Sequence, residues 1–122
     1  MVSVPSFLLK RLYVKGSLTR TADGFEFQVR NQLGSGFAYK MLPVTLDGQP
    51  FPLEMCYFRA EEGEEQSFDD VSSERPFTLE MGKSLFVGVR EAPLAPGPHK
   101  IGLGFVVQGI GQLQFEVSDV AE

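Results

Sequence analysis

Tryptophan is absent from this sequence, and cysteine and histidine each occur once. A single cysteine, Cys56, cannot form a disulfide within the chain, so nothing calls for an oxidising compartment. A single histidine, His99, cannot build a histidine-rich metal site, and no paired nucleophile is visible beside it. These scarcities argue against disulfide-stabilised folds and against the commonest transition-metal and triad chemistry.

Long apolar runs are also missing from the chain. No stretch approaches the ~20 residues that a membrane-spanning helix needs. The N-terminal residues lack the basic stretch and apolar core that signal peptides have. We therefore expect a cytoplasmic protein with no membrane segment.

Positive charge is scarce overall, and the formal net charge is −5. This balance argues against a broad surface for nucleic acid or anionic membrane. The charge is also uneven, because residues 1–40 carry +4 and the remainder carries −9. Faces of opposite charge favour association, so we expect a homo-oligomer or a complex with a larger enzyme subunit, and no nucleic-acid partner.

Phenylalanine, glycine and proline are plentiful, with 11, 13 and 8 residues respectively. A length of 122 residues suits one domain, residues 1–122. No window of helical length has apolar residues at helical spacing, which predicts little or no helix. About eight short strands, separated by turn residues, predict an all-β fold: a single antiparallel β-sandwich or jelly-roll-like domain.

Alternation of apolar and polar residues marks the clearest strands. Residues 25–31 alternate strictly, and residues 101–107 and 113–117 alternate on either side of Gly109 and Gly111, which predicts a C-terminal hairpin. The predicted core consists of the apolar side chains on these inward faces and on residues 85–87, namely Phe25, Phe27, Val29, Leu85, Val87, Ile101, Leu103, Phe105, Leu113 and Phe115.

Turn residues bound the other predicted strands. The Asp-Gly pairs at 23–24 and 47–48 are typical of hairpin turns. Residues 8–18 are predicted as a first, open strand that a neighbouring chain could pair with. Pro50 and Pro52 remove two ladder donors, so their segment is an edge or a connection. Further strands are expected within residues 37–46, 55–60, 77–79 and 85–89.

Seven carboxylates crowd into residues 61–74, with no cation before Arg75. Hard cations such as calcium need several converging oxygen ligands. Neighbouring side chains on an extended segment point to opposite sides, and the spacing fits no familiar cation loop. We predict a solvated or mobile acidic loop and not a metal site; its carboxylates are Glu61, Glu62, Glu64, Glu65, Asp69, Asp70 and Glu74.

The remaining candidate residues carry no recognisable chemistry. His99 has the imidazole of a general base or metal ligand, but a structural or surface role is favoured. Cys56 has no CxxC partner and is predicted as a packed core thiol. The glycine pairs 102/104 and 109/111 precede no helix, so they predict a strand face approached by another backbone, and a turn.

No catalytic, cofactor-binding or metal-ligating residue is therefore assigned, and no cofactor is expected. Aromatic rings can line a groove for a sugar, or they can fill a core. The tyrosines leave both alternatives open: Tyr13, Tyr39 and Tyr57.

Parts of the chain resemble the small β subunit of bacterial C-glycoside deglycosidases. The matching stretches are Leu-Pro-Val-Thr-Leu-Asp-Gly at 42–48, Phe58 with the acidic stretch that contains Ser67 and Phe68, and Leu-Ala-Pro-Gly-Pro-His-Lys-Ile at 94–101. In that family a V-D-G hairpin precedes a polar insertion, and an L-x-x-G-x-H turn opens a late strand. Residues 5–16 resemble a related group of small proteins, some of which are named hydroxymethylglutaryl-CoA reductase.

The resemblance implies a β-sandwich or jelly-roll partner of a separate barrel-shaped subunit that holds the metal and most catalytic residues. The chain would then be an accessory subunit of a carbon–carbon lyase complex, and no catalytic residue carries over. We favour such a non-catalytic accessory or interaction module. The alternative is a small-ligand or carbohydrate-binding domain, with or without catalysis on a concave sheet face. An aromatic and polar pocket would favour the alternative, and a flat apolar patch the accessory module.

Overall fold

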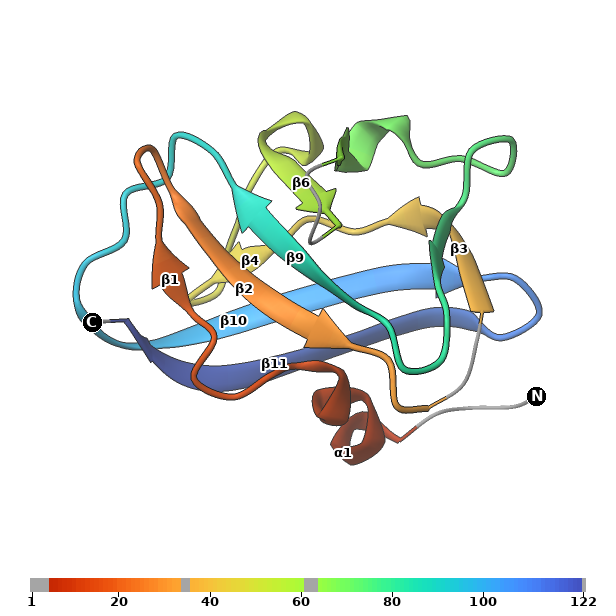
Figure 1. The fold of residues 1–122 in the computed structure, drawn as a ribbon, viewed down its shortest axis with the longest axis horizontal. Helices are drawn as coiled ribbons and strands as arrows, with labels where there is room; N and C mark the ends of the chain where they lie inside the picture. Colours follow the sequence, from red (N-terminus) through yellow and green to blue (C-terminus); the bar gives the residue numbers. More distant parts are fainter. Residues whose placement is uncertain (1–4, 34–35, 61–63, 122) are drawn as a thin grey trace.

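Two antiparallel sheets pack face to face in the computed structural model, which describes residues 5–33, 36–60 and 64–121 (Figure 1). The prediction of an all-β sandwich is therefore confirmed. The first sheet has the strand order β1-β2-β9-β6-β7. Its strands are β1 (Thr19–Arg20), β2 (Phe25–Arg30), β9 (Ser84–Val89), β6 (Cys56–Arg59) and β7 (Glu65–Ser67).

The second sheet is built on the predicted C-terminal hairpin of β10 (Gly97–Val107) and β11 (Gly111–Ala121), which pair along their whole length. The other edge of β10 pairs with β3 (Gly36–Met41) and then with β4 (Thr45–Leu46). Two short strands complete the sheet, β5 (Gln49–Pro50) beside β4 and β8 (Phe77–Leu79) beside β3. The prolines thus lie at an edge of the sheet and just beyond it, as predicted.

The expected first strand over residues 8–18 is wrong. The segment begins within the short helix α1 (Ser6–Leu9) and contains the 3-10 turn η1 (Lys10–Leu12). Leu8, Leu9 and Leu12 share one face of a helical turn, a spacing that suits inward packing in a helix as well as in a strand. Two further 3-10 turns are η2 (Leu53–Met55) and η3 (Phe68–Asp70). No helix among the described residues is long and apolar enough to cross a membrane.

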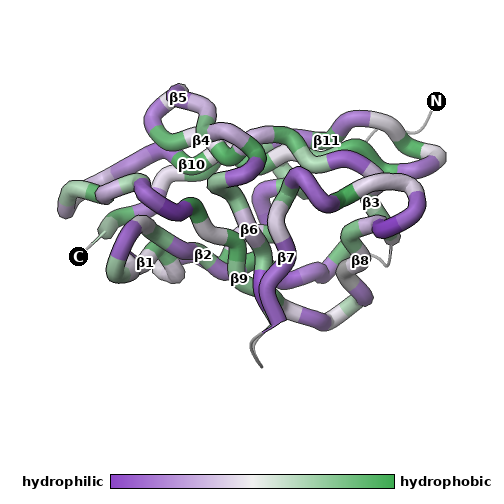
Figure 2. Tube along the Cα trace, turned by 90° about the horizontal axis from the view of Figure 1, so that it is seen from above, coloured by the Kyte–Doolittle hydropathy of each residue, from purple (hydrophilic) through white to green (hydrophobic). Residues whose placement is uncertain are grey.

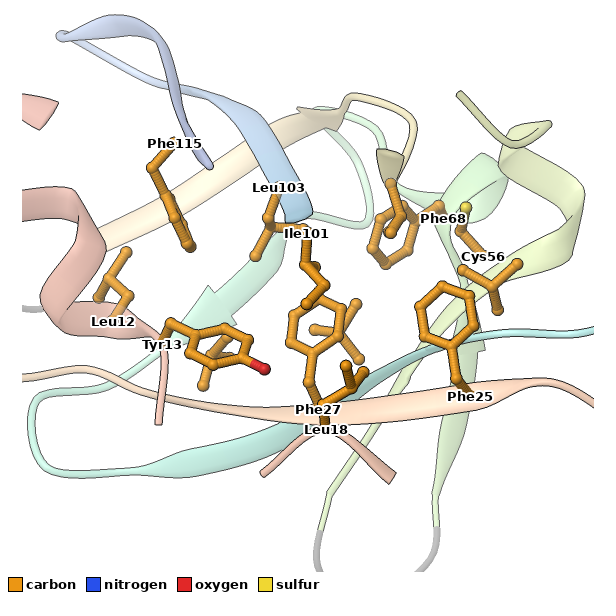
Figure 3. Packing of buried hydrophobic residues seen from close by; sticks show 14 of the residues in the cluster. Leu12, Tyr13, Leu18, Phe25, Phe27, Cys56, Phe68, Ile101, Leu103 and Phe115 are labelled. Carbon is orange, nitrogen blue, oxygen red and sulfur yellow. The ribbon is translucent and has the colours of Figure 1, made fainter. Parts of the chain in front are cut away.

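The predicted alternation places the core between the sheets. Phe25, Phe27 and Val29 of β2 are buried, and Figure 3 shows Phe27 pointing toward Ile101 of the other sheet, with Phe25 pointing to the same side near Cys56. Eight of the ten predicted core residues are buried, while Phe105 and Leu113 are partly buried and pack against the core. In Figure 2 the two layers are seen along their edges, and β7 is hydrophilic along its length.

Glycines act in this fold through turn geometry and close side-chain contacts. Asp47 and Gly48 both have positive φ angles, 51° and 85°, as the predicted Asp-Gly turn between β4 and β5 requires. Gly102 and Gly104 are closely approached, by side chains at both positions and by backbone as well at Gly104. An added Cβ at Gly102 would lie 2.1 Å from the Thr45 hydroxyl oxygen, and one at Gly104 would lie 2.7 Å from a Leu42 methyl and 3.3 Å from the Leu113 carbonyl oxygen.

The segment after η1 joins the two sheets along one side of the sandwich. Tyr13 forms an isolated bridge with Val29 of the first sheet. The Tyr13 hydroxyl donates to the carboxylate of Asp119 in β11 of the second sheet, at 2.6 Å. The same carboxylate accepts the backbone N–H groups of Gly16 at 3.0 Å and Leu18 at 3.3 Å. Residues 13–18 therefore hold β2 and β11 together.

The N-terminal segment, from α1 to residue 18, also covers β11. In the described part of the chain, β11 pairs with one strand, β10. Helix α1 and η1 both contact β11, and Figure 1 shows the red N-terminal segment running beside it. The Lys15 ammonium donates to the Ser118 carbonyl at 3.2 Å. Covering a long edge strand with a helix and a loop protects it from pairing with other chains.

Replacing Phe27 with Ala tests the assignment of the buried face. Phe27 is fully buried, so the variant should lose about 3–5 kcal/mol of unfolding free energy in chemical denaturation. Phe7→Ala is the matched control, because Phe7 is 66% exposed and should change stability by less than about 0.5 kcal/mol. Equal losses in the two variants would contradict this packing.

Candidate functional site

An apolar pocket of about 390 Å³ opens between the sheets at one end of the sandwich. Helix α1 and η1 form one wall, and the remaining walls come from β2, β3, β8, β9 and the β10–β11 hairpin. Asn31 is the one lining residue with a polar side chain in the described part of the chain. The other lining residues include Leu8, Leu9, Leu12, Val29, Leu33, Phe37, Ala38, Met41, Phe77, Val87, Leu103, Phe105, Val107, Ile110 and Leu113.

The local sequence explains why this end is hollow. The register between β3 and β10 shifts between Val106 and Val107, so that the inward side chains Ala38 and Met41 are three residues apart instead of two. Ala38 contributes only a methyl group where the neighbouring inward positions carry long side chains. The shift and the small residue leave space that Phe105 and Val107 do not fill.

Two of the residues that line the pocket also have exposed apolar side chains. They are Leu33 and Phe37, which are 39% and 44% exposed. We call Leu33 and Phe37 the apolar rim. Clusters of large exposed apolar residues mark binding surfaces more often than isolated ones do.

His99 connects residues 94–101 to residues 42–48, the two stretches with turn motifs that resemble those of C-glycoside deglycosidases. Its Nδ1 lies 2.7 Å from the Asp47 carboxylate and its Nε2 lies 2.7 Å from the Ala95 carbonyl. Both partners are acceptors, so both ring nitrogens donate, which only the imidazolium can do. The Asp47 hydrogen bond, helped by the Ala95 carbonyl, raises the pKa of His99. The other Asp47 oxygen accepts the Lys100 N–H at 2.9 Å.

This pair is therefore a clamp between the β4–β5 turn and the start of β10. The Lys100 N–H, and then His99, hold the pKa of Asp47 below its usual range. Neither ring nitrogen of His99 is available to a substrate, which agrees with the structural role predicted from sequence. Asp47 and His99 are 52 residues apart in the chain, and no spacing rule could have paired them.

A second polar cluster lies on the outer face of the first sheet. The Glu26 carboxylate accepts the Tyr57 hydroxyl at 2.7 Å and two N–H groups of Arg59 at 2.8 and 2.9 Å. The Arg59 guanidinium holds the pKa of Glu26 below its usual range. Burial, and then the bond to Glu26, raises the pKa of Tyr57. Within the cluster, the Glu26 and Arg59 charges are paired and the Tyr57 hydroxyl has an acceptor.

Gly88 makes this arrangement possible. An added Cβ at Gly88 would lie 2.5 Å from the Tyr57 ring, so only glycine lets that ring lie across β9 to reach Glu26 on β2. The Arg90 guanidinium covers the ring at 4.5 Å from its centroid and also pairs with Glu65. The cluster closes this sheet face and leaves Tyr57 buried.

Part of the predicted acidic loop is ordered structure. Residues 61–63, and with them Glu61 and Glu62, lie outside the described residues. Residues 65–70 form β7 and η3, and Phe68 is buried in the core, so a loop is wrong for this part. The described carboxylates of residues 64–74 are nevertheless exposed, as a solvated segment requires. Glu65 pairs with Arg90, and Asp69 accepts a hydrogen bond from Ser67. Across the described ranges, no three His, Cys, Asp or Glu residues form a group that could hold a metal ion.

The other candidate residues are dispersed. Cys56 is buried, as predicted, and burial raises the pKa of its thiol. The three tyrosines form no common groove: Tyr13 points to Asp119, Tyr57 lies under Arg90, and Tyr39 is exposed on β3. Their arrangement does not make a stacking platform for a sugar.

Sequence reasoning missed Asp119. Burial raises the pKa of its carboxyl, but the Tyr13 hydroxyl and the N–H groups of Val120, Leu18 and Gly16 outweigh burial and hold the pKa below its usual range. The alternation of β11 contained a signal, because a carboxylate at 119 continues the inward positions 113, 115 and 117. The pocket itself had no such signal, since it depends on the register shift in β3.

The clamp predicts a pH dependence of stability. The pKa of His99 in the folded protein is raised above 6.5. The stabilisation of the folded state by protonated His99 is therefore fully present below pH 6.5 and is lost as pH rises through the folded pKa. We expect the difference in Tm between the wild type and His99→Gln to shrink from about pH 5 to about pH 9. A difference that stays constant or grows across this range would contradict the clamp.

The chain also matches a known protein family. The match covers residues 8–122, and the family is described as "Hydroxymethylglutaryl-CoA reductase, N-terminal domain". No curated protein matches the chain. Since the family match spans almost the whole sequence, this chain belongs to the hydroxymethylglutaryl-CoA reductase N-terminal domain family.

Proposed function

We propose that this chain is a non-catalytic interaction module that works beside a larger enzyme subunit and docks through the apolar rim. The observation that carries the proposal is that Leu33 and Phe37 line the pocket and are exposed. Aromatic side chains are enriched in protein interfaces, where their large area is desolvated. A partner covering this end would remove both side chains from water.

The polar groups support binding over catalysis. Both nitrogens of His99 donate to fixed acceptors, and Glu26 is occupied by Tyr57 and Arg59. A general base needs a free lone pair within reach of the substrate's proton. The two clusters we find in the described residues instead connect strands and turns to each other.

The family supports a role beside another unit. Its description names an N-terminal domain, which is by definition one part of a larger protein. The resemblance to the small subunit of C-glycoside deglycosidases has the same implication, and its two motifs meet in the Asp47–His99 clamp. We place the complex in the cytoplasm, where a lone buried thiol such as Cys56 needs no oxidation.

A shallow basic hollow supports an acidic surface on the partner. Lys10, Lys15 and Lys100 line it together with Tyr13, Val117, Ser118 and a single acidic residue, Glu116. Complementary charge of this kind sets the orientation and the rate of docking more than the affinity. Lys10 belongs to η1, directly after the helix that walls the pocket, so the hollow and the rim can face the same partner.

The alternatives have less support. Pairing between copies through an open strand at residues 8–18 loses its basis, because that segment is α1, η1 and a cover for β11. A carbohydrate would need polar side chains, whereas Asn31 is the one that the structure places among the pocket's lining residues.

Replacing Phe37 with Asp tests the docking surface. The full chain, tagged and recovered from its native host, should run in analytical ultracentrifugation as a complex with one larger chain in fixed stoichiometry. Phe37→Asp should weaken this complex at least tenfold, because it places a charge in the desolvated rim. Gln49→Asp is the control, since Gln49 is exposed on the edge strand β5 and lines neither the pocket nor the basic hollow.

Three outcomes would overturn the proposal. A mass of 13.5 kDa for the wild type would mean that the chain works alone. A multiple of that mass with no larger chain would mean a homo-oligomer. A complex that Phe37→Asp and Gln49→Asp weaken equally would mean that the rim is not the docking surface.

A further inference from the structure

We propose that the pocket beneath the apolar rim is a binding site for a single hydrocarbon chain, such as the alkyl or acyl chain of a small amphiphile. This inference goes beyond the proposed function, because it concerns the interior of the sandwich and requires no partner protein.

The depth of the pocket favours a chain over a protein surface. Its walls include Leu9, Val29, Met41, Val87 and Leu103, which are between 1% and 5% exposed. A protein partner can cover the rim but cannot reach walls that are already shielded from solvent. A narrow, flexible chain can pass the rim and contact them.

The chemistry of the walls selects an apolar occupant. Among the described lining residues, Asn31 alone has a polar side chain, and its Oδ1 accepts the Leu33 N–H at 3.0 Å. The described lining residues include no charged group that could compensate a buried charge. A polar or charged head group would therefore remain at the mouth.

The volume sets the length of the chain. An apolar cavity of about 150 Å³ holds one benzene molecule of six carbon atoms. By that scale the 390 Å³ here accommodates on the order of 12–16 carbon atoms. Protein interiors have few voids larger than a water molecule, because unfilled space forfeits dispersion contacts. A hollow of this size next to a well-packed core indicates a built site.

A chain-length series on the isolated protein tests this site. We expect isothermal titration calorimetry to show one binding site per protein molecule. The ligands are hexanoate, octanoate, decanoate and dodecanoate, with decan-1-ol as an uncharged ligand. Affinity should rise roughly fourfold for each added CH₂ group across this series. Binding should have a negative heat-capacity change and should raise Tm.

Filling the pocket provides the matched variant. Ala38→Leu adds three carbon atoms to the hollow, so dodecanoate should bind at least tenfold more weakly while Tm is kept or raised. Tyr39→Leu is the control, because Tyr39 is the next residue of β3 and is exposed outside the pocket. It should leave dodecanoate binding unchanged.

Several results would overturn the inference. These are no saturable binding of dodecanoate or decan-1-ol, affinity that does not depend on chain length, or equal binding by Ala38→Leu and wild type. The titrations with ligands of increasing length use the wild-type protein, so they test the inference even if Ala38→Leu fails to fold. A missing partner would overturn only the proposed function, and missing dodecanoate binding with an intact complex would overturn only this site.

Discussion

The carboxylate of Asp119 is the interaction on which the rest of this structure depends. It lies in β11 of the second sheet, yet the groups that it binds are the Tyr13 hydroxyl and the N–H groups of Gly16 and Leu18. Tyr13 is also bridged to Val29 of the first sheet. A buried carboxylate must be fully hydrogen-bonded to be tolerated, so this one fixes where the N-terminal segment runs.

The position of that segment has consequences for the edge and for the pocket. By running between β2 and β11, residues 13–18 close one side of the sandwich and cover the long β11 strand. They also hold α1 and η1 in place, and Leu8, Leu9 and Leu12 then wall the pocket. The candidate binding end therefore depends on a contact outside the pocket. The clamp of His99 and Asp47 has the corresponding role for the loop before β10.

Much of the fold could be predicted from sequence, and little of the site. Alternation in β2, β10 and β11 specifies which side chains face inward, because the side-chain period of a strand is two. For residues 8–18 the pattern predicted a strand and was wrong, because the spacing of the apolar residues suits a turn of helix as well as a strand. The pocket could not be predicted, since it arises from the register shift opposite Val107 and the small side chain of Ala38. Contacts such as Asp119 with Tyr13 span 106 residues, and local patterns do not encode them.

Native-state hydrogen exchange of Asp119→Ala tests the central role of this carboxylate most directly. Removing the acceptor should free the N-terminal segment locally, so the amides of Gly16 and Leu18 should lose protection while the amide of Phe27 in β2 keeps it. Ser118→Ala, an adjacent exposed change, should leave all of them unchanged. Unchanged exchange at Gly16 and Leu18 in Asp119→Ala, or an equal loss of protection at Phe27, would contradict the account.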